Sequence, residues 1–290
     1  MGWRTVVVTK NCKLSYKNGY LVIRSEEIQT IHLSEISSII VENGMASITS
    51  YLMNELANNK IKLIICDEKH NPSCELMPYY GSFNTAKKIA KQSKWTNERK
   101  GIAWQNLIKH KIHNQAMLLK KLEISGYEKL LEYEADVQFF DKTNREGHSA
   151  KVYFNLLFGL DFKRNNDDNI NKALDYGYSI LLSIFNREIV NKGYITPLGI
   201  QHKNEFNQYN FSCDLMEQFR PLIDEIVFNN KKCQFNKEFK YKLINVANRI
   251  ITINGKQQFL NNAIPIFIAN IAEFLENKEE SEKLIFNYEF

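Results

Sequence analysis

The sequence predicts an α+β protein in which a small β-rich domain precedes a larger helical domain. Three observations lead to this prediction. Short β-branched runs separated by turn residues fill the first 75 residues, and apolar residues recur at three- and four-residue spacing after about residue 84. Between the two regions, the segment 67–81 carries two prolines and a glycine. A chain of 290 residues, 44% of them hydrophobic and 24% charged, is long enough for two globular domains.

The predicted β-rich domain covers residues 1–80, and its elements follow from local composition. Asn18-Gly19 stands between two strand-like runs, which is typical of a tight hairpin. Helical spacing of apolar residues predicts one helix from about Ile48 to Asn58. The six predicted strands are Arg4–Thr9, Leu14–Tyr16, Tyr20–Arg24, Gln29–Leu33, Ser38–Val41 and Lys62–Cys66.

The predicted helical domain covers residues 81–290. One apolar stripe runs from Trp104 to Leu119, and a second runs from Ile170 to Phe185. Breaks near Pro197 and at Asn254-Gly255 separate the later helices. We therefore expect an all-α domain.

The formal net charge of +5 is concentrated in one stretch, the basic connector 81–120. It contains nine Lys or Arg residues and one acidic residue, whereas residues 1–80 are balanced and residues 121–290 are slightly acidic. Such a local excess is typical of contact with a polyanion, for which nucleic acid is the obvious choice. Trp95 and Trp104 could stack on splayed bases, although a core position suits Trp104 at least as well. The predicted phosphate-binding residues are Lys87, Lys88, Lys91, Lys94, Arg99, Lys100, Lys109 and Lys111.

Several classes of protein are excluded. No run of about 18 apolar residues is present, which argues against a transmembrane helix. The N-terminus lacks the pattern of a signal peptide, so we expect a cytoplasmic protein. Five widely spaced cysteines without a CxxC pair argue against a disulfide framework or a zinc ribbon. The absence of a GxxxxGK[ST] motif argues against a P-loop nucleotide site.

Three segments contain candidate metal ligands. Glu146 opens a helical run, where the alternative role of a carboxylate is to stabilise the helix N-terminus. His202 follows a Gly/Pro turn, and a lone histidine is often merely exposed. Asp214 and Glu217 lie three residues apart, a spacing that also fits an ordinary exposed acidic helix face. Together, Glu146, His202 and one or both of these acids form an oxygen-rich set that suits Mg²⁺ or Mn²⁺ and could activate a phosphodiester.

Six segments of the chain carry a resemblance to one family. They are Gly2–Val8, Lys13–Asn18, Asn144–Ala150, Asn169–Tyr178, Gly199–His202 and Asn210–Pro221. In composition and order they resemble the CRISPR adaptation integrases, in particular the branch from type II-A systems. Several motifs in one order are far more specific than any one of them.

The resemblance implies an N-terminal β-domain that forms a homodimer and a helical domain that binds a divalent metal, Mg²⁺ or Mn²⁺. The family's catalytic metal ligands match Glu146, His202 and Glu217. Asp214 matches a further acidic position that binds the metal directly or through water. The resemblance also implies a heterohexamer, in which two integrase dimers flank one dimer of a small ferredoxin-like CRISPR adaptation protein.

The implied activity is spacer acquisition in antiviral defence. The 3′-hydroxyls of a captured DNA fragment attack the ends of a CRISPR repeat, and one phosphodiester replaces another. Two alternatives use the same residues differently. One is a metal-dependent nuclease that hydrolyses branched or double-stranded DNA with water as the nucleophile. The other is a non-catalytic DNA-binding assembly module whose acidic cluster is a solvated helix face.

Overall fold

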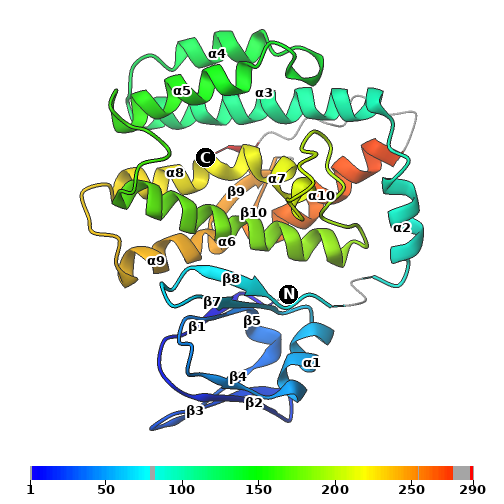
Figure 1. The fold of residues 1–290 in the computed structure, drawn as a ribbon, viewed down its shortest axis with the longest axis vertical. Coiled ribbons are helices and arrows are strands. Elements are labelled where there is room, and N and C mark those ends of the chain that lie inside the picture. The colour runs from blue at the N-terminus through cyan, green and yellow to red at the C-terminus, as the bar shows by residue number, and fades with distance from the viewer. Residues whose placement is uncertain (1, 79–81, 254, 277–287, 290) are drawn as a thin grey trace. The chain divides into compact units, whose positions relative to one another are not determined.

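The computed structural model describes residues 2–78, 82–253, 255–276 and 288–289. The chain separates into two compact units, Met1–Phe83 and Asn84–Phe290. The first unit is β-rich and the second is mostly helical (Figure 1), which confirms the predicted α+β class. The domain boundary predicted between residues 80 and 81 lies outside the described residues.

The N-terminal unit consists of two four-stranded sheets and one α-helix. In the first sheet, of order β1-β5-β7-β8, the first three strands are parallel and β8 is antiparallel to β7. The second sheet has the order β4-β3-β2-β6. The elements are β1 (Arg4–Val8), β2 (Lys13–Lys17), β3 (Tyr20–Arg24), β4 (Ile28–His32), η1 (Leu33–Glu35), β5 (Ile36–Val41), β6 (Ser47–Ile48), α1 (Ser50–Asn58), β7 (Lys62–Cys66) and β8 (Pro72–Glu75).

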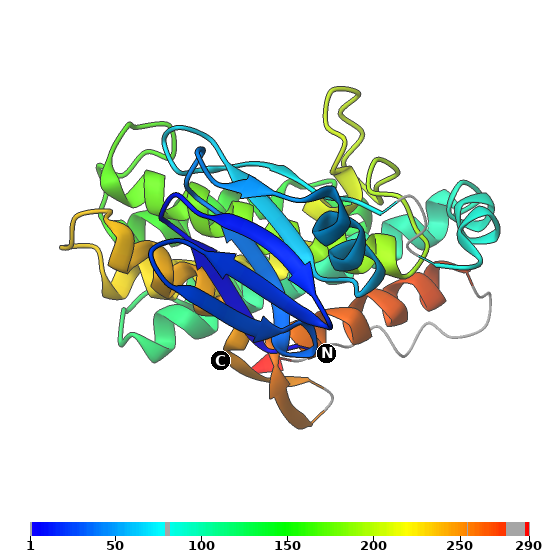
Figure 2. The same cartoon turned by 90° about the horizontal axis from the view of Figure 1, so that it is seen from below.

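One hydrophobic core joins the two sheets and α1. Side chains of β5 and β7, of β2 and β3, and of α1 all contribute to it. In Figures 1 and 2, α1 lies beside the strands of this unit. The largest buried contributors are Leu14, Leu21, Ile36, Ile39, Leu52 and Leu56.

The structure contains each strand and the helix predicted for this unit. Asn18 and Gly19 both have positive φ, 50° and 86°, as the tight turn between β2 and β3 requires. The segment 67–81, predicted to lack periodic structure, nevertheless contains β8. Pro72 is tolerated there because it is the first residue of a strand at the sheet edge.

The C-terminal unit contains two long helices around which shorter ones pack. In Figure 1, α3 lies in one layer with α4 and α5, while α6, α8 and α9 form another. The α3 helix also contacts α7, α8 and α10, and its buried residues lie between Gly101 and Leu119. The helices are α2 (Thr85–Gln92), α3 (Asn97–Lys121), α4 (Glu128–Ala135), η2 (Phe139–Asp141), α5 (Arg145–Phe158), α6 (Asn169–Asn191), α7 (Asn210–Met216), η3 (Glu217–Phe219), α8 (Arg220–Asn229), α9 (Lys237–Ile244), η4 (Asn245–Asn248) and α10 (Leu260–Glu276).

The expectation of an all-α second domain is wrong in one place. A hairpin of β9 (Ile250–Ile253) and β10 (Lys256–Phe259), with β11 (Tyr288–Glu289) paired to β9, forms a small sheet. Figure 2 shows this hairpin projecting from the helices. Asn254-Gly255, taken above as a helix break, stands between two strand runs and is the same hairpin signal as Asn18-Gly19. Among the described residues, no helix is both long and apolar enough to cross a membrane.

Candidate active site

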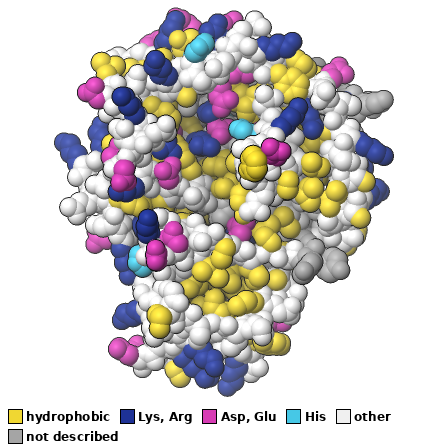
Figure 3. Space-filling model, in the orientation of Figure 1, with side chains coloured by type: hydrophobic (Ala, Val, Ile, Leu, Met, Phe, Trp, Pro, Cys, Tyr) yellow, Lys and Arg dark blue, Asp and Glu magenta, His cyan; other side chains and the backbone are white. Residues whose placement is uncertain are grey.

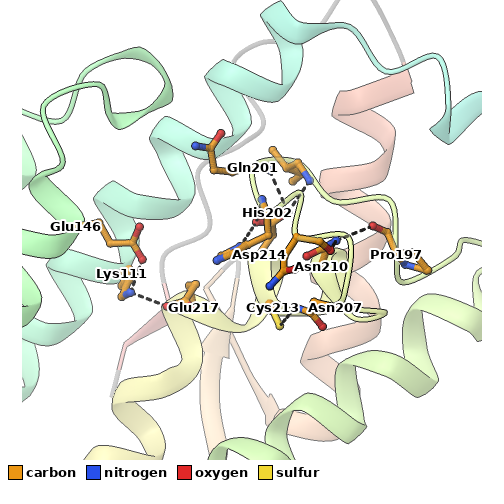
Figure 4. Close-up of polar contacts among 12 residues, drawn as sticks. Lys111, Glu146, Pro197, Gln201, His202, Asn207, Asn210, Cys213, Asp214 and Glu217 are labelled. Atoms are coloured by element: carbon orange, nitrogen blue, oxygen red, sulfur yellow. Dashed lines mark hydrogen bonds and ion pairs between the residues drawn. The ribbon is translucent and has the colours of Figure 1, made fainter. Parts of the chain in front are cut away.

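Glu146 lies in the first turn of α5, as predicted, but it does not cap the helix. The Asp141 carboxylate does so, accepting hydrogen bonds from the backbone N–H of Arg145 (2.8 Å) and of Glu146 (3.0 Å). The Glu146 side chain instead points toward Lys111 on α3 (Figure 4), and 26% of it is exposed. Its carboxylate is therefore available for a role other than helix stabilisation.

Lys111, from the middle of α3, lies between two carboxylates. Its Nζ is 2.6 Å from Glu146 Oε1 and 2.5 Å from Glu217 Oε2. Glu217 begins the 3-10 turn that follows α7, and its other oxygen, Oε1, contacts Arg220 Nη2 at 2.8 Å. Glu217 and Lys111 are both buried, so they are not part of a solvated acidic helix face.

Asp214 is fully buried and holds the segment that carries His202. Its Oδ1 accepts hydrogen bonds from His202 Nδ1 (2.6 Å) and from the His202 backbone N–H (3.1 Å). Its Oδ2 accepts from the N–H groups of Ile200 (2.5 Å) and Gln201 (3.1 Å). Four donors thus occupy the two oxygens, and His202 presents its Nε2 away from Asp214.

Gly199 allows this segment to approach Asp214 closely. A Cβ at this position would lie 2.5 Å from the His202 carbonyl oxygen and 2.7 Å from Asp214 Oδ2. Two buried amides hold the rest of the loop. Gln92 bonds to the backbone of Ile195 and Leu198, and Asn210 donates to the carbonyls of Pro197 and Asn204.

Trp104 orients the imidazole from the other side. Its ring makes an edge-to-face contact with His202, with centroids 5.7 Å apart and planes at 90°. Trp104 is buried, and so is Trp95, which packs against Tyr194 and Phe211. Because both indoles are buried, neither is accessible to stack on a base. Trp104 and Trp95 are therefore both core residues.

The surroundings shift the pKa values of the site in opposite directions. Burial tends to raise the pKa of Glu217, but Arg220 and Lys111 outweigh it and lower the value to about 2. The hydrogen bond to Asp214 raises the pKa of His202, and the charges of Glu217 and Glu146 add to the effect. His202 therefore lies within electrostatic range of both glutamates.

Glu146, Glu217 and His202 are of the residue types that bind a divalent cation. Glu146 and Glu217 converge on one cation, an ammonium, from two different helical segments. His202 has the carboxylate partner on Nδ1 that metal-binding histidines usually have, which leaves Nε2 for a ligand. Within residues 2–78, 82–253 and 255–276, however, no three His, Cys, Asp or Glu side chains are close enough to form a metal cluster. The three residue types suit a divalent ion, but in this structure Lys111 stands between Glu146 and Glu217.

On the face seen in Figure 3, acidic side chains and a histidine gather in a hollow of the helical unit. A family model, described as "CRISPR associated protein Cas1", matches residues 5–263. The chain belongs to the Cas1 family. It is 31% identical over 266 residues to the CRISPR-associated endonuclease Cas1 of Neisseria meningitidis, covering 89% of this chain and 87% of that protein.

Solved structures share the Cas1 fold of this chain. A casposase bound to its integration product is similar with a TM-score of 0.79 and 20% identity, over 97% of this chain and 93% of that one. A chain of a Cas6-RT-Cas1–Cas2 complex is similar with a TM-score of 0.73 and 18% identity, over 97% of this chain but 36% of that longer one.

The basic connector of this Cas1 chain differs in part from the prediction. Lys87 and Lys94 are exposed, and no ion pair within the described part of the chain involves them. Lys88 and Lys91 instead contact Glu276 at 3.2 Å and 2.6 Å. Arg99 donates to the Phe274 carbonyl, Lys100 and Lys109 are half-buried, and Lys111 is buried.

The position of Lys111 does not fit the predicted contact with DNA phosphate, because its ammonium is bonded to carboxylates inside the unit. The sequence contains a signal for this. Lys111 follows Leu107 by four residues and Ile108 by three, so it lies on the apolar stripe of α3. The roles of Asp141, Gln92 and Asn210 have no comparable signal, because each depends on partners from other parts of the chain.

Arg220, which contacts Glu217, belongs to a buried polar network with Tyr178, Tyr153 and Asp224. Arg220 places its guanidinium carbon 4.5 Å from the centre of the Tyr178 ring. Tyr178 (2.5 Å) and Tyr153 (2.8 Å) both donate a hydrogen bond to the Asp224 carboxylate. Tyr178 belongs to α6, Tyr153 to α5 and Asp224 to α8, so their hydrogen bonds join these three helices.

This network predicts a pH effect on stability. Burial raises the pKa of Asp224 to about 6, although the two tyrosines and Arg220 oppose the change. Because the folded protein keeps this proton at pH values where the unfolded chain has lost it, Asp224 costs stability increasingly as the pH rises from about 4 through about 6. We expect the Asp224→Asn variant to gain stability relative to the wild type between pH 4 and pH 7, by at most about 3 kcal/mol.

Denaturant unfolding of both proteins at several pH values measures this difference. Asp167→Asn, which removes an exposed carboxylate, is the control. A difference between Asp224→Asn and the wild type that stays constant with pH would contradict the prediction.

Proposed function

We propose that this Cas1 protein is a CRISPR adaptation integrase that inserts captured DNA fragments into a repeat array. One observation carries the proposal: Glu146 and Glu217 converge on a single cation beside a histidine whose Nδ1 is bonded to a buried carboxylate. The similarity to a casposase bound to its integration product supports the same class of reaction. The endonuclease name of the Neisseria relative supports action on DNA.

Glu146, Glu217 and Nε2 of His202 would hold Mg²⁺ or Mn²⁺. The ion supplies Lewis-acid activation of a phosphodiester and lowers the pKa of the attacking hydroxyl. We assign Asp214 to positioning rather than to direct binding of the ion, because four hydrogen bonds already occupy its oxygens. Those bonds fix the tautomer and orientation of the His202 ring.

The proposed reaction exchanges one phosphodiester for another. The 3′-oxygen of the captured fragment forms a bond to a phosphorus at the repeat edge and loses its proton. The bond from that phosphorus to the 3′-oxygen of the repeat strand breaks, and this oxygen takes up a proton to become a new 3′-hydroxyl. Because one phosphodiester bond forms as another breaks, the reaction does not require hydrolysis of a nucleoside triphosphate.

From the family resemblance we propose a second copy of this chain and a small CRISPR adaptation protein as partners. Figure 3 shows hydrophobic side chains gathered on one face of the N-terminal unit. In the same unit, four large apolar side chains are more than half exposed: Trp3, Ile28, Met45 and Tyr51. Exposed apolar side chains of this size suit the proposed homodimer. A Cas1 chain occurs with Cas2 in one similar solved complex, which supports a protein partner. The heterohexamer with a small ferredoxin-like partner is proposed from the family resemblance. From the sequence we also propose membership of the type II-A branch and a cytoplasmic location.

The decisive assay is joining of a labelled DNA fragment to a repeat-containing plasmid in the presence of Mg²⁺ or Mn²⁺. We expect joined strands, with more product when the small partner is present. Shortened strands without joined product would favour the alternative of a metal-dependent nuclease. No DNA product under any condition would favour the non-catalytic module.

The DNA path is tested by the salt dependence of binding. Each phosphate contact with duplex DNA contributes about 0.9 to the slope of log affinity against log salt. We expect the double variant Lys87→Ala/Lys94→Ala to reduce that slope by about 1.8, because both ammonium groups are exposed. Lys120→Ala, a similarly exposed lysine outside the predicted set, is the control. An unchanged slope in the double variant would place the DNA path elsewhere.

A further inference from the structure

Lys111 occupies the place that the proposed divalent ion needs. Its Nζ lies within 2.6 Å of one oxygen of each glutamate, Glu146 Oε1 and Glu217 Oε2. Figure 4 shows the ammonium between the two carboxylates, with His202 and Asp214 beside them. An ion bound by both of these oxygens would take the same position, so the ammonium and the ion exclude each other there.

The charges around this position are already balanced. The carboxylates of Glu146 and Glu217 face the cations of Lys111 and Arg220, and Arg220 Nη2 lies 2.8 Å from Glu217 Oε1. The four groups have a formal charge of zero. In the DNA-free protein these four groups therefore present no net negative charge to a divalent cation, although the two carboxylates alone would attract it strongly.

We propose that Lys111 is a resident counter-cation that competes with the divalent ion, so that the ion binds tightly only together with DNA phosphate. This inference rests on the proposed metal site. The lysine holds the two glutamates together without metal, since two carboxylates so close to each other would repel without a cation between them. When the ion enters, the ammonium leaves, and the two glutamates, Arg220 and the ion then carry a formal charge of +1. A DNA phosphate at the site offsets this excess.

The movement that this requires is small. Lys111 has a flexible four-carbon stem, whereas its helix is anchored by the buried neighbours Ile108 and Ile112. The ammonium can thus leave without a shift of α3. Coupling between two ligands is reciprocal, so DNA raises the affinity for the ion by the same factor by which the ion raises the affinity for DNA.

The test measures Mn²⁺ binding by titration calorimetry, with and without a short DNA duplex. This measurement does not depend on strand-joining activity. Lys111→Met removes the charge and keeps an apolar stem of similar length. We expect this variant to bind Mn²⁺ about tenfold or more tightly than the wild type without DNA, and to gain less from added DNA. Lys120→Met removes a charge from the same helix away from the carboxylates and should match the wild type. Equal or weaker Mn²⁺ binding by Lys111→Met would overturn the inference.

Thermal unfolding gives a second readout. Without metal, Lys111→Met should melt below the wild type, and saturating Mn²⁺ should raise its melting temperature more than that of the wild type. If Lys111→Met fails to fold, Lys111→Gln serves the same comparison. Absence of Mn²⁺ binding by the wild type in both conditions would overturn the proposed metal site itself. Wild-type binding that is lost in Glu146→Gln, without a gain in Lys111→Met, would overturn only the role of Lys111.

Discussion

The Glu146→Ala variant is expected to lose metal-dependent strand joining by roughly three orders of magnitude or more while it retains DNA binding. Glu146 supplies one of the two carboxylates that converge on the cation position. Its removal should cost little folding stability, because Asp141 satisfies the first N–H groups of α5 and Lys111 keeps its contact with Glu217. Joining assays, DNA titration and denaturant unfolding of the same preparation measure the three quantities.

The control is Glu128→Ala on α4. Glu128 is also a first-turn glutamate, but it is exposed. If stabilisation of the helix N-terminus were the role of such residues, the two variants would behave alike. Retained joining by Glu146→Ala would contradict the metal assignment.

The second large effect is expected for Asp214→Asn, which should unfold more easily by about 3–5 kcal/mol and lose strand joining. Four donors point at the two oxygens of Asp214. An asparagine offers one oxygen and one NH₂ group, so at least one buried donor would face another donor. The loop 199–202 would then lose its anchor and the His202 ring its fixed orientation.

Denaturant unfolding and joining assays measure these two losses, and two variants separate their causes. His202→Ala removes the imidazole but keeps the three backbone hydrogen bonds, so it should abolish joining at little cost in stability. Asp175→Asn removes an exposed carboxylate and should change neither property. An Asp214→Asn protein as stable as the wild type would show that these buried hydrogen bonds contribute little.

The sequence predicted most of the fold because its signals are local. Strand runs, the Asn18-Gly19 turn and the apolar stripes depend on residues close together in the chain. The two errors arose where one signal had two interpretations. Pro72 can end a strand or begin one at a sheet edge, and Asn254-Gly255 can interrupt a helix or join two strands.

The candidate site was predicted less completely. Glu146, His202 and Glu217 were found from ligand chemistry and family resemblance, and the structure brings the two glutamates to one cation. Asp214 and Glu217 were expected on one helix face, yet they have different partners. The reason is that their partners come from different parts of the chain: the segment 200–202 donates to Asp214, whereas Lys111 and Arg220 contact Glu217.

By itself, the sequence determined the order of a β-rich and a helical domain, the local basic excess and the kinds of side chain available to bind a metal. Only the tertiary structure decided that Lys111 neutralises Glu146 and Glu217 and that Asp214 anchors the His202 loop. These arrangements depend on contacts between residues that are separated by 12 to 106 positions in the sequence. Since a buried charge is tolerated only beside its partners, the fold rather than the residue types determines which charged group serves as ligand, counter-ion or anchor.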